Sequence, residues 1–238
     1  MSKRMLMNIS MIPSGLSVAD IGCDHGWVSI YLAKQGIAPR VIAMDVADGP
    51  LSMAKEHIKE AGLDNMITVK KSDGLCELAT DEFGNPEADV VLIAGMGGHL
   101  AIRLIEDSID KCIRLKYLIL QIQSDIAFVR KRITELGFMI DDESMVLDEG
   151  KYYTAIRIVP NVDMVDIKYS EKELLYGPVL LEKKVKVLYD YLQGRRSTCE
   201  AIIEKIGNNS DNEAGVERTA DVQHELELID ECLYEFDL

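Results

Sequence analysis

The hydrophobic residues of this chain follow two different patterns on either side of residue 160. Before it, short runs of β-branched and aliphatic residues alternate with amphipathic stretches, which is typical of βαβ units on a parallel sheet. Because the runs are apolar throughout, we expect strands that are buried on both faces. The predicted strands span residues 17–21, 41–44, 67–70, 89–93 and 117–121, with helices after the first two and the last two.

The sheet is expected to end in an antiparallel hairpin. A predicted helix at residues 125–136 is followed by Gly137 and by two β-like runs, 138–147 and 152–159. We expect residues 1–160 to form a complete domain, because a domain of about 150 residues buries an adequate core.

After residue 160, a polar linker leads into apolar residues with heptad spacing. One set runs from Leu181 to Ile206 and a second from Val222 to Phe236, with a polar turn at residues 207–212 between them. Arg195 stands in the first set at a position that favours an apolar residue. The pattern predicts a second domain, residues 161–238, in which two helices form an antiparallel coiled-coil hairpin.

The strongest candidate for a binding site is the turn after the first predicted strand, which reads Asp20-Ile21-Gly22-Cys23-Asp24-His25-Gly26. Its glycines let the backbone approach a ligand, and the next helix presents free N–H groups. The two carboxylates would repel the pyrophosphate of a dinucleotide, whereas they suit the ammonium and sulfonium groups of S-adenosylmethionine. The alternative is an ordinary turn between strand and helix.

Two further carboxylates follow later strands. Asp45 comes about twenty residues after the glycine turn, where an acidic side chain can accept both ribose hydroxyls, and Val46 would lie against the adenine. Asp73, before Gly74, is a candidate for the adenine amino group. A solvated strand end and a simple Asp-Gly turn are the alternatives at these two places.

The fourth predicted strand runs into a glycine-rich loop, Ala94-Gly95-Met96-Gly97-Gly98. Because its glycines carry no side chains, the backbone groups of this loop would face a methyl acceptor. A phosphate-binding loop of the G-x-x-x-x-G-K-[ST] type is excluded, because the required Lys and hydroxyl are absent.

Charge and cysteine content narrow the choice of partners. A formal net charge of −15 does not by itself predict nucleic-acid binding, so an RNA surface would depend on local basic patches. Five scattered cysteines without C-x-x-C spacing indicate reduced thiols rather than disulfides or a metal site. No apolar run is long enough to cross a bilayer, and we expect a cytoplasmic protein. The candidate patches are Lys3 with Arg4, residues 130–132, and Lys183, Lys184, Lys186, Arg195 and Arg196.

These motifs together resemble the bacterial tRNA (adenine-22)-N1-methyltransferases. The resemblance lies in residues 19–25, 43–46, 49–51, 73–75 and 93–98 and continues into 118–121 and 150–153. It implies an α/β fold with a Rossmann-like class I methyltransferase sheet, a terminal β-hairpin and a C-terminal coiled coil. The chain departs from the family at Gln121-Ile122-Gln123, where the family pattern is Gln-Pro-Asn.

The resemblance also implies S-adenosylmethionine as cofactor and tRNA as partner, with no membrane and no metal. The expected cofactor residues are Asp20, Gly22, Cys23, Asp24, His25, Gly26, Asp45, Val46, Asp73, Gly74 and Ala94. The expected residues at the methyl acceptor are Gly95, Met96, Gly97, Gly98, His25 and Tyr153, with Trp27 a second candidate for stacking. We expect a monomer, or a homodimer formed through the hairpin.

Three alternatives stay open at the level of sequence. A methyltransferase of a small molecule or protein is favoured by the acidic charge and disfavoured by the segment Gly95-Met96-Gly97-Gly98. A nicotinamide-dependent oxidoreductase is disfavoured by the acidic turn and by the lack of a sixth βα unit. A catalytically silent scaffold is disfavoured by the complete set of candidate cofactor residues.

Overall fold

The computed structural model describes residues 1–207 and 213–237. The chain divides into two compact units, Met1–Lys168 and Tyr169–Leu238. The boundary that we expected at residue 160 lies at the end of the last strand, β7 (Lys151–Pro160), whereas the division between the two units follows Lys168.

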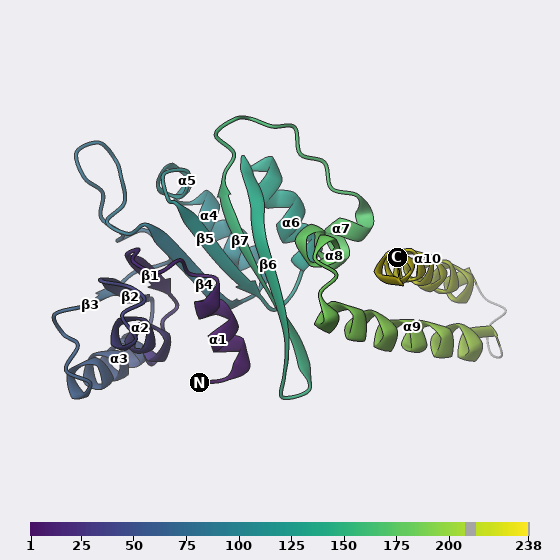
Figure 1. Ribbon diagram of the computed structural model, residues 1–238, viewed down its shortest axis with the longest axis horizontal. Coiled ribbons are helices and arrows are strands. Elements are labelled where there is room, and N and C mark those ends of the chain that lie inside the picture. The colour runs from purple at the N-terminus through teal and green to yellow at the C-terminus, as the bar shows by residue number, and fades with distance from the viewer. Residues whose placement is uncertain (208–212, 238) are drawn as a thin grey trace. The chain divides into compact units, whose positions relative to one another are not determined.

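The first unit is built on a seven-stranded sheet with the order β3-β2-β1-β4-β5-β7-β6 (Figure 1). Its parallel strands are β1 (Val18–Ile21), β2 (Val41–Asp45), β3 (Ile67–Lys71), β4 (Val90–Met96) and β5 (Tyr117–Ile122). All five predicted strands are therefore present, within three residues at each end. The strand order reverses between β1 and β4, and ligands bind at such switch points in open α/β sheets.

The terminal hairpin is also present. Strand β6 (Phe138–Asp148) pairs antiparallel with β7, which in turn pairs antiparallel with β5. Glu149 and Gly150 form the turn with φ angles of 49° and 78°, and two positive φ values are the mark of the tight turn that suits a hairpin. The expected mixed α/β fold with a Rossmann-like sheet is confirmed.

Helices cover both faces of this sheet. Helices α1 (Lys3–Ser10), α2 (Trp27–Lys34) and α3 (Asp48–Glu60) pack on the face that carries Val18, Leu92 and Ile119. Helices α4 (Gly98–Glu106) and α6 (Ile126–Glu135) contact each other. Helix α4 also contacts β4 and β5, and α6 contacts β6. The short helix α5 (Ile109–Cys112) follows α4.

Helix α1 was not expected from the sequence. Ser2 caps its first turn by accepting the N–H of Met5 at 3.2 Å. The helix lies beside β6 in Figure 1 and also contacts α2 and β7. Residues 7–9 are buried, so this short N-terminal segment forms one wall of the first unit rather than a loose end.

The second unit is helical. It contains α7 (Glu171–Tyr176), α8 (Pro178–Glu182), α9 (Lys186–Gly207) and α10 (Glu213–Asp237). The long helix that we expected from Leu181 begins only at Lys186, because Lys184 adopts a left-handed conformation with φ of 48°. Leu188 and Leu192 of α9 and Ile229 of α10 are fully buried, as the heptad pattern predicts.

Helices α9 and α10 pack against each other, whereas coiled-coil winding of the pair stays a prediction. The polar turn predicted at 207–212 lies, apart from its first residue, outside the described residues. Arg195 interrupts the apolar set because its guanidinium reaches across to the Glu225 carboxylate, with Nε and Oε1 3.0 Å apart. This interhelical ion pair gives Arg195 a structural role.

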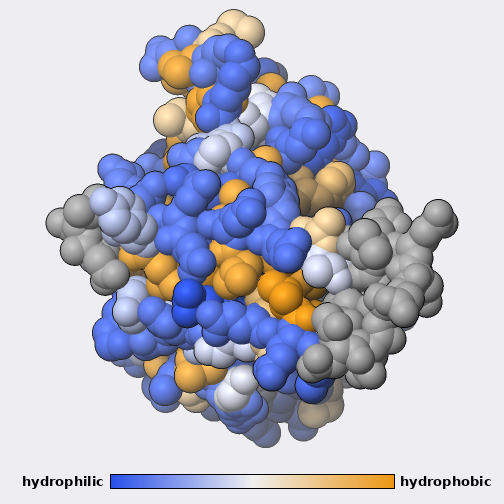
Figure 2. All heavy atoms as spheres, turned by 90° about the vertical axis from the view of Figure 1, so that its right-hand side faces the viewer, coloured by the Kyte–Doolittle hydropathy of each residue, from blue (hydrophilic) through white to orange (hydrophobic). Residues whose placement is uncertain are grey.

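The surface turned to the viewer in Figure 2 is mostly hydrophilic, with hydrophobic side chains gathered near its middle. Within the described parts of the chain, no helix is both long and apolar enough to span a membrane. All five cysteines are free, and Cys76 alone among them is exposed.

Candidate active site

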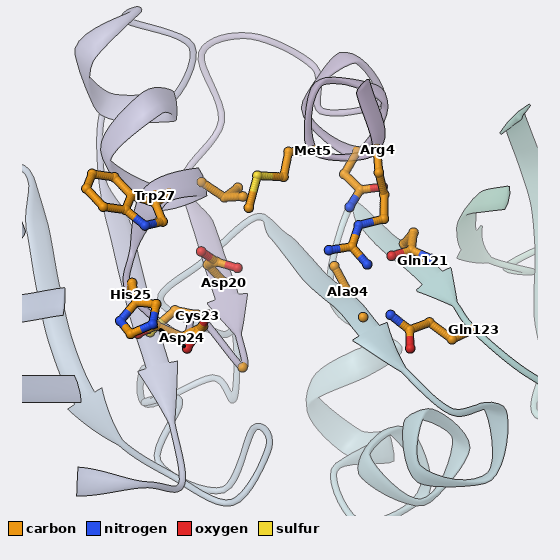
Figure 3. Close-up of a pocket in the computed structure, with 14 residues that line it drawn as sticks. Arg4, Met5, Asp20, Cys23, Asp24, His25, Trp27, Ala94, Gln121 and Gln123 are labelled. Atoms are coloured by element: carbon orange, nitrogen blue, oxygen red, sulfur yellow. Dashed lines mark hydrogen bonds and ion pairs between the residues drawn. The ribbon is translucent and has the colours of Figure 1, made fainter. Parts of the chain in front are cut away.

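A cavity of about 270 Å³ opens at the switch point of the sheet, at the carboxyl ends of β1, β4 and β5 (Figure 3). Strand alternation places Asp20, Ala94 and Gln121 on the face that α1, α2 and α3 cover. The lining comes from α1, the glycine turn, α2, β4 and the end of β5, namely Arg4, Met5, Asn8, Asp20, Gly22, Cys23, Asp24, His25, Trp27, Val28, Ala94, Gly95, Gln121 and Gln123.

The glycine turn is held by backbone hydrogen bonds. The N–H groups of Gly22 and Cys23 both donate to the carbonyl of Met44, at 2.8 and 3.0 Å. Gly22 has a φ of 72°, and a Cβ at this position would lie 2.6 Å from Cε of Met96. Glycine is favoured here because the left-handed backbone conformation strains other residues, and a Cβ would also require the end of the Met96 side chain to move.

Asp45 lies directly behind this turn. Its Oδ2 accepts the N–H of Asp24 at 3.2 Å, and its Oδ1 accepts the N–H of Ala47 at 3.0 Å. The carboxylate expected to bind ribose hydroxyls thus also joins the end of β2 to the glycine turn. Each carboxylate oxygen has a second lone pair, so these bonds leave capacity for a ligand.

Asp20 forms the acidic floor of the cavity. Its side chain is 3% exposed and accepts a hydrogen bond from the Ser29 hydroxyl at 2.7 Å. Burial raises the pKa of this carboxyl group to about 6, against the opposing effect of the Ser29 hydrogen bonds. A cation bound beside Asp20 would favour its ionised form. Burial also raises the pKa of the neighbouring Cys23 thiol, which is therefore neutral and unsuited to act as a nucleophile.

The rim of the cavity is built around His57, a residue to which the sequence analysis assigned no role. Its Nδ1 lies 3.0 Å from the carbonyl oxygen of His25, and its ring stacks on Trp27 with centroids 4.3 Å apart. No local sequence signal marks His57, because it reaches the turn from α3, 32 residues along the chain. Trp27 is 47% exposed, so one aromatic residue stands at the mouth of the cavity.

Amide side chains and a guanidinium form the opposite wall. Figure 3 shows Arg4, Gln121 and Gln123 across the cavity from Asp20, Trp27 and His25. Asn8 and Gln121 are 2% and 0% exposed. The sequence pattern marked Arg4 as part of a basic patch and Gln121-Ile122-Gln123 as a departure from the family, but it did not mark Asn8, since α1 was not predicted. A glutamine at the end of the apolar run Tyr117–Ile122 was the available signal for Gln121.

The glycine-rich loop after β4 divides into two parts. Gly95 lines the cavity with a φ of 78°, and Met96 packs under the glycine turn. Gly98 lies against the segment after β5, where a Cβ would come 2.8 Å from the carbonyl oxygen of Ser124. A Cβ on Gly97 would lie 3.2 Å from the Ser124 hydroxyl. Close packing against the backbone therefore explains why residue 98 carries no side chain, whereas Gly97 faces only the hydroxyl of Ser124.

The other predicted site residues do not line the cavity. Val46 is 61% exposed beyond β2, and Gly26 lies close to Ala54 of α3. Asp73 pairs with Arg103, at 3.1 Å between Oδ1 and a guanidinium nitrogen. Gly74 and Tyr153 pack against other residues of the protein. A Cβ on Gly74 would lie too close to the Leu104 side chain, and the centroid of the Tyr153 ring lies 5.1 Å from the Arg4 guanidinium.

Comparison with known proteins decides the family. A family model described as a methyltransferase domain matches residues 1–156. The chain belongs to the methyltransferase domain family. The match covers all seven strands up to residue 156, and with them every element that lines the cavity.

The similarity of this methyltransferase to known proteins extends over both of its units. It is 29% identical over 237 residues to the tRNA (adenine(22)-N(1))-methyltransferase of Bacillus subtilis, covering 98% of this chain and 97% of that protein. The crystal structure of the B. subtilis m1A22 tRNA methyltransferase TrmK matches it with a TM-score of 0.80 at 28% identity, covering 98% of each chain. The resemblance expected from the sequence motifs is confirmed.

A third relative carries a ligand. A candidate tRNA (m1A22) methyltransferase from Streptococcus pneumoniae, solved in complex with S-adenosyl-L-methionine, matches with a TM-score of 0.82 at 27% identity. That match covers 98% of this chain and 99% of the other.

Proposed function

We propose that this protein transfers the methyl group of S-adenosylmethionine to N1 of adenine 22 in tRNA. The observation that carries the proposal is the similarity to the B. subtilis tRNA (adenine(22)-N(1))-methyltransferase, which extends over 98% of the chain and so includes both units. A methyltransferase domain alone is shared by enzymes with many acceptors, whereas similarity through the helical unit narrows the acceptor class.

The residues of the cavity fit the cofactor. The buried Asp20 carboxylate suits the ammonium group, and the close glycine turn lets the backbone contact the ligand. Asp45 retains acceptor capacity for the ribose hydroxyls. S-adenosylmethionine supplies a methyl group bonded to a positively charged sulfur, which makes its carbon electrophilic.

The acceptor requires positioning more than base catalysis. N1 of neutral adenine has a free lone pair, so no proton has to leave before it attacks in line with the sulfur–methyl bond. The methylated ring carries a positive charge, and the cavity offers the carboxylate of Asp20 as a nearby anion. Because N1 is paired within a stem, the adenine has to leave the helix, and Trp27 at the rim offers a surface for stacking.

We place the tRNA contact on the face formed by α1 and α2. A second, largely apolar cavity of about 420 Å³ lies there, lined by Met1, Ser2, Met5, Trp27, Ile30, Tyr31 and Lys34. It shares Met5 and Trp27 with the first cavity, and aromatic rings beside a lysine suit a base and its phosphate.

Several residues of the basic patches expected elsewhere form ion pairs within the protein. Arg130 is buried in an ion pair with Glu143, and Arg132 pairs with Glu106. On α9, Arg196 pairs with Asp230 of α10, and Arg195 pairs with Glu225 of the same helix. These pairs weaken the hypothesis that the hairpin grips RNA through its basic residues.

The proposal is tested on cellular tRNA. N1-methyladenine blocks Watson–Crick pairing, so reverse transcription should stop at position 22 of tRNA from cells that contain the protein and should pass it in cells that lack the gene. Stops that are the same in both cells would reject the tRNA function. That result would favour a small-molecule or protein acceptor, with which the net charge of −15 is consistent.

A further inference from the structure

Unpaired polar atoms are concentrated at the cavity. Among the described residues, four buried side-chain nitrogen or oxygen atoms have no hydrogen-bond partner. Three of the four belong to residues that line the cavity: Oδ1 of Asn8, Oε1 of Gln121 and Nδ1 of His25. Folding normally pairs buried polar groups, so this concentration indicates groups that are kept for a ligand.

The amide of Gln121 is held in one orientation. Its Nε2 donates to the carbonyl of Ile122 at 3.3 Å, which leaves Oε1 as an acceptor. Its partners in register are Ala94 on β4 and Ala155 on β7. Small neighbours on both sides leave space above the sheet for the amide, which lines the cavity.

Asn8 presents a second acceptor from α1. Its Oδ1 is buried without a partner, and the residue lines the same cavity as Gln121. The Gln121 amide stands across the cavity from Asp20 and the glycine turn (Figure 3). Asp20 is the group suited to the cationic cofactor, whereas neutral amides suit a neutral ring.

We infer that Asn8 and Gln121 recognise the exocyclic amino group of the acceptor adenine. This inference rests on the proposed function. The Watson–Crick edge of adenine offers the N1 lone pair and an amino group with two N–H donors. Two side-chain oxygens beside the cavity match those donors.

The same arrangement discriminates against guanine. Guanine carries an acceptor oxygen at position 6 and a proton on N1, so its oxygen would face the two amide oxygens. Sites built to hydrogen-bond a polar group reject analogues that lack it by large factors, because buried partners are then left unpaired. Asn8 and Gln121 thus act as specificity-determining residues that touch the acceptor base.

The test pairs a variant with a substrate analogue. Gln121→Met keeps the length of the side chain and removes the acceptor, and tRNA with purine riboside at position 22 lacks the amino group. For the wild-type enzyme, kcat/KM should fall at least tenfold from adenosine to purine riboside. For Gln121→Met, adenosine should lose a similar factor, and purine riboside should show little further loss. Comparing the two enzymes cancels the intrinsic difference in reactivity between the bases.

Controls separate recognition from general damage. Gln35→Met changes an exposed glutamine that does not line the cavity and should not reduce the preference for adenosine. Affinity for S-adenosylmethionine should be unchanged in Gln121→Met, and its melting temperature should change little, because the substitution removes a buried oxygen without a partner together with one long hydrogen bond to the carbonyl of Ile122. Asn8→Leu provides the same comparison from α1 if Gln121→Met does not fold.

Two results would overturn the inference. One is a wild-type enzyme that uses purine riboside as well as adenosine, and the other is a variant that loses the same factor on both substrates. A wild-type enzyme that binds S-adenosylmethionine but methylates neither tRNA would reject the proposed function itself, and the inference with it.

Discussion

The carboxylate of Asp20 accepts a hydrogen bond from the Ser29 hydroxyl at 2.7 Å in a position that is 3% exposed. Burial outweighs this bond and raises the pKa of Asp20 from 3.8 to about 6. The group ionises less readily in the folded protein than in the unfolded chain, so its charge lowers the free energy of unfolding at neutral pH. A charge retained at such a cost in stability indicates a binding role.

Asp20→Asn should therefore stabilise the ligand-free protein, with a dependence on pH. The destabilisation by the wild-type charge develops as pH rises from 3.8, the value for an unperturbed carboxyl group, to about 6 and is complete above it. The gain in melting temperature of the variant should grow over this range and then stay level. Thermal unfolding of both proteins between about pH 4 and pH 8 measures it.

The same substitution should weaken cofactor binding. Calorimetry should show that wild-type affinity for S-adenosylmethionine declines as pH falls below about 6, the pKa of Asp20, whereas the variant binds weakly throughout. Asp24→Asn is the matched control for stability, because this side chain is 69% exposed and its substitution should give no gain in melting temperature. A wild-type affinity independent of pH would contradict this role for Asp20.

Asp45→Ala should raise the dissociation constant of S-adenosylmethionine at least tenfold, which corresponds to about 1.4 kcal/mol. The variant loses the acceptor for the ribose and also the bond to the N–H of Asp24 that holds the turn. Asp48→Ala removes an exposed carboxylate that pairs with Lys71 nearby and should bind normally. Unchanged affinity in a folded Asp45 variant would reject the assigned cofactor position.

The two neighbouring glycines after β4 should respond differently to alanine. Gly98→Ala should lower the melting temperature, because its Cβ would meet the backbone carbonyl of Ser124 at 2.8 Å. Gly97→Ala should be tolerated, since its Cβ meets only the hydroxyl of that serine, at 3.2 Å, and φ is −71°. Equal melting temperatures for the two variants would contradict the packing described here.

Sequence patterns predicted the sheet well because its information is local. Apolar runs mark β4 and β5, and the Glu149-Gly150 turn marks the hairpin. Asp20 and Gly22 were identifiable because a strand, a turn and a helix succeed one another directly. The position of α1 in the lining of the cavity depends on tertiary packing, and the local sequence of this short, methionine-rich segment does not predict it.

Long-range contacts also account for what the sequence did not reveal. Arg195 looked like a functional interruption of an apolar heptad, yet its partner Glu225 is 30 residues away on the facing helix. Asp73 was expected to be free for a ligand, and Arg103, 30 residues later, pairs with it. Pairings between distant residues cannot be read from local spacing.

Arg195→Gln should leave the salt dependence of tRNA affinity unchanged, because its charge is already paired with Glu225. Lys34→Gln should lower the slope of log affinity against log salt by about one, if this lysine contacts a phosphate. Binding across a salt series measures both. A slope reduced by Arg195→Gln and not by Lys34→Gln would move the RNA surface to the hairpin.

The proposed methylation of adenine 22 is tested most directly by methyl transfer from the purified protein to two unmodified tRNA transcripts. One transcript has adenine and the other has guanine at position 22. Products are mapped by the position at which reverse transcription stops. We expect transfer to the first transcript alone, with a stop at position 22. Transfer at another position, equal transfer to both transcripts, or none to either in a protein that binds S-adenosylmethionine would contradict this expectation.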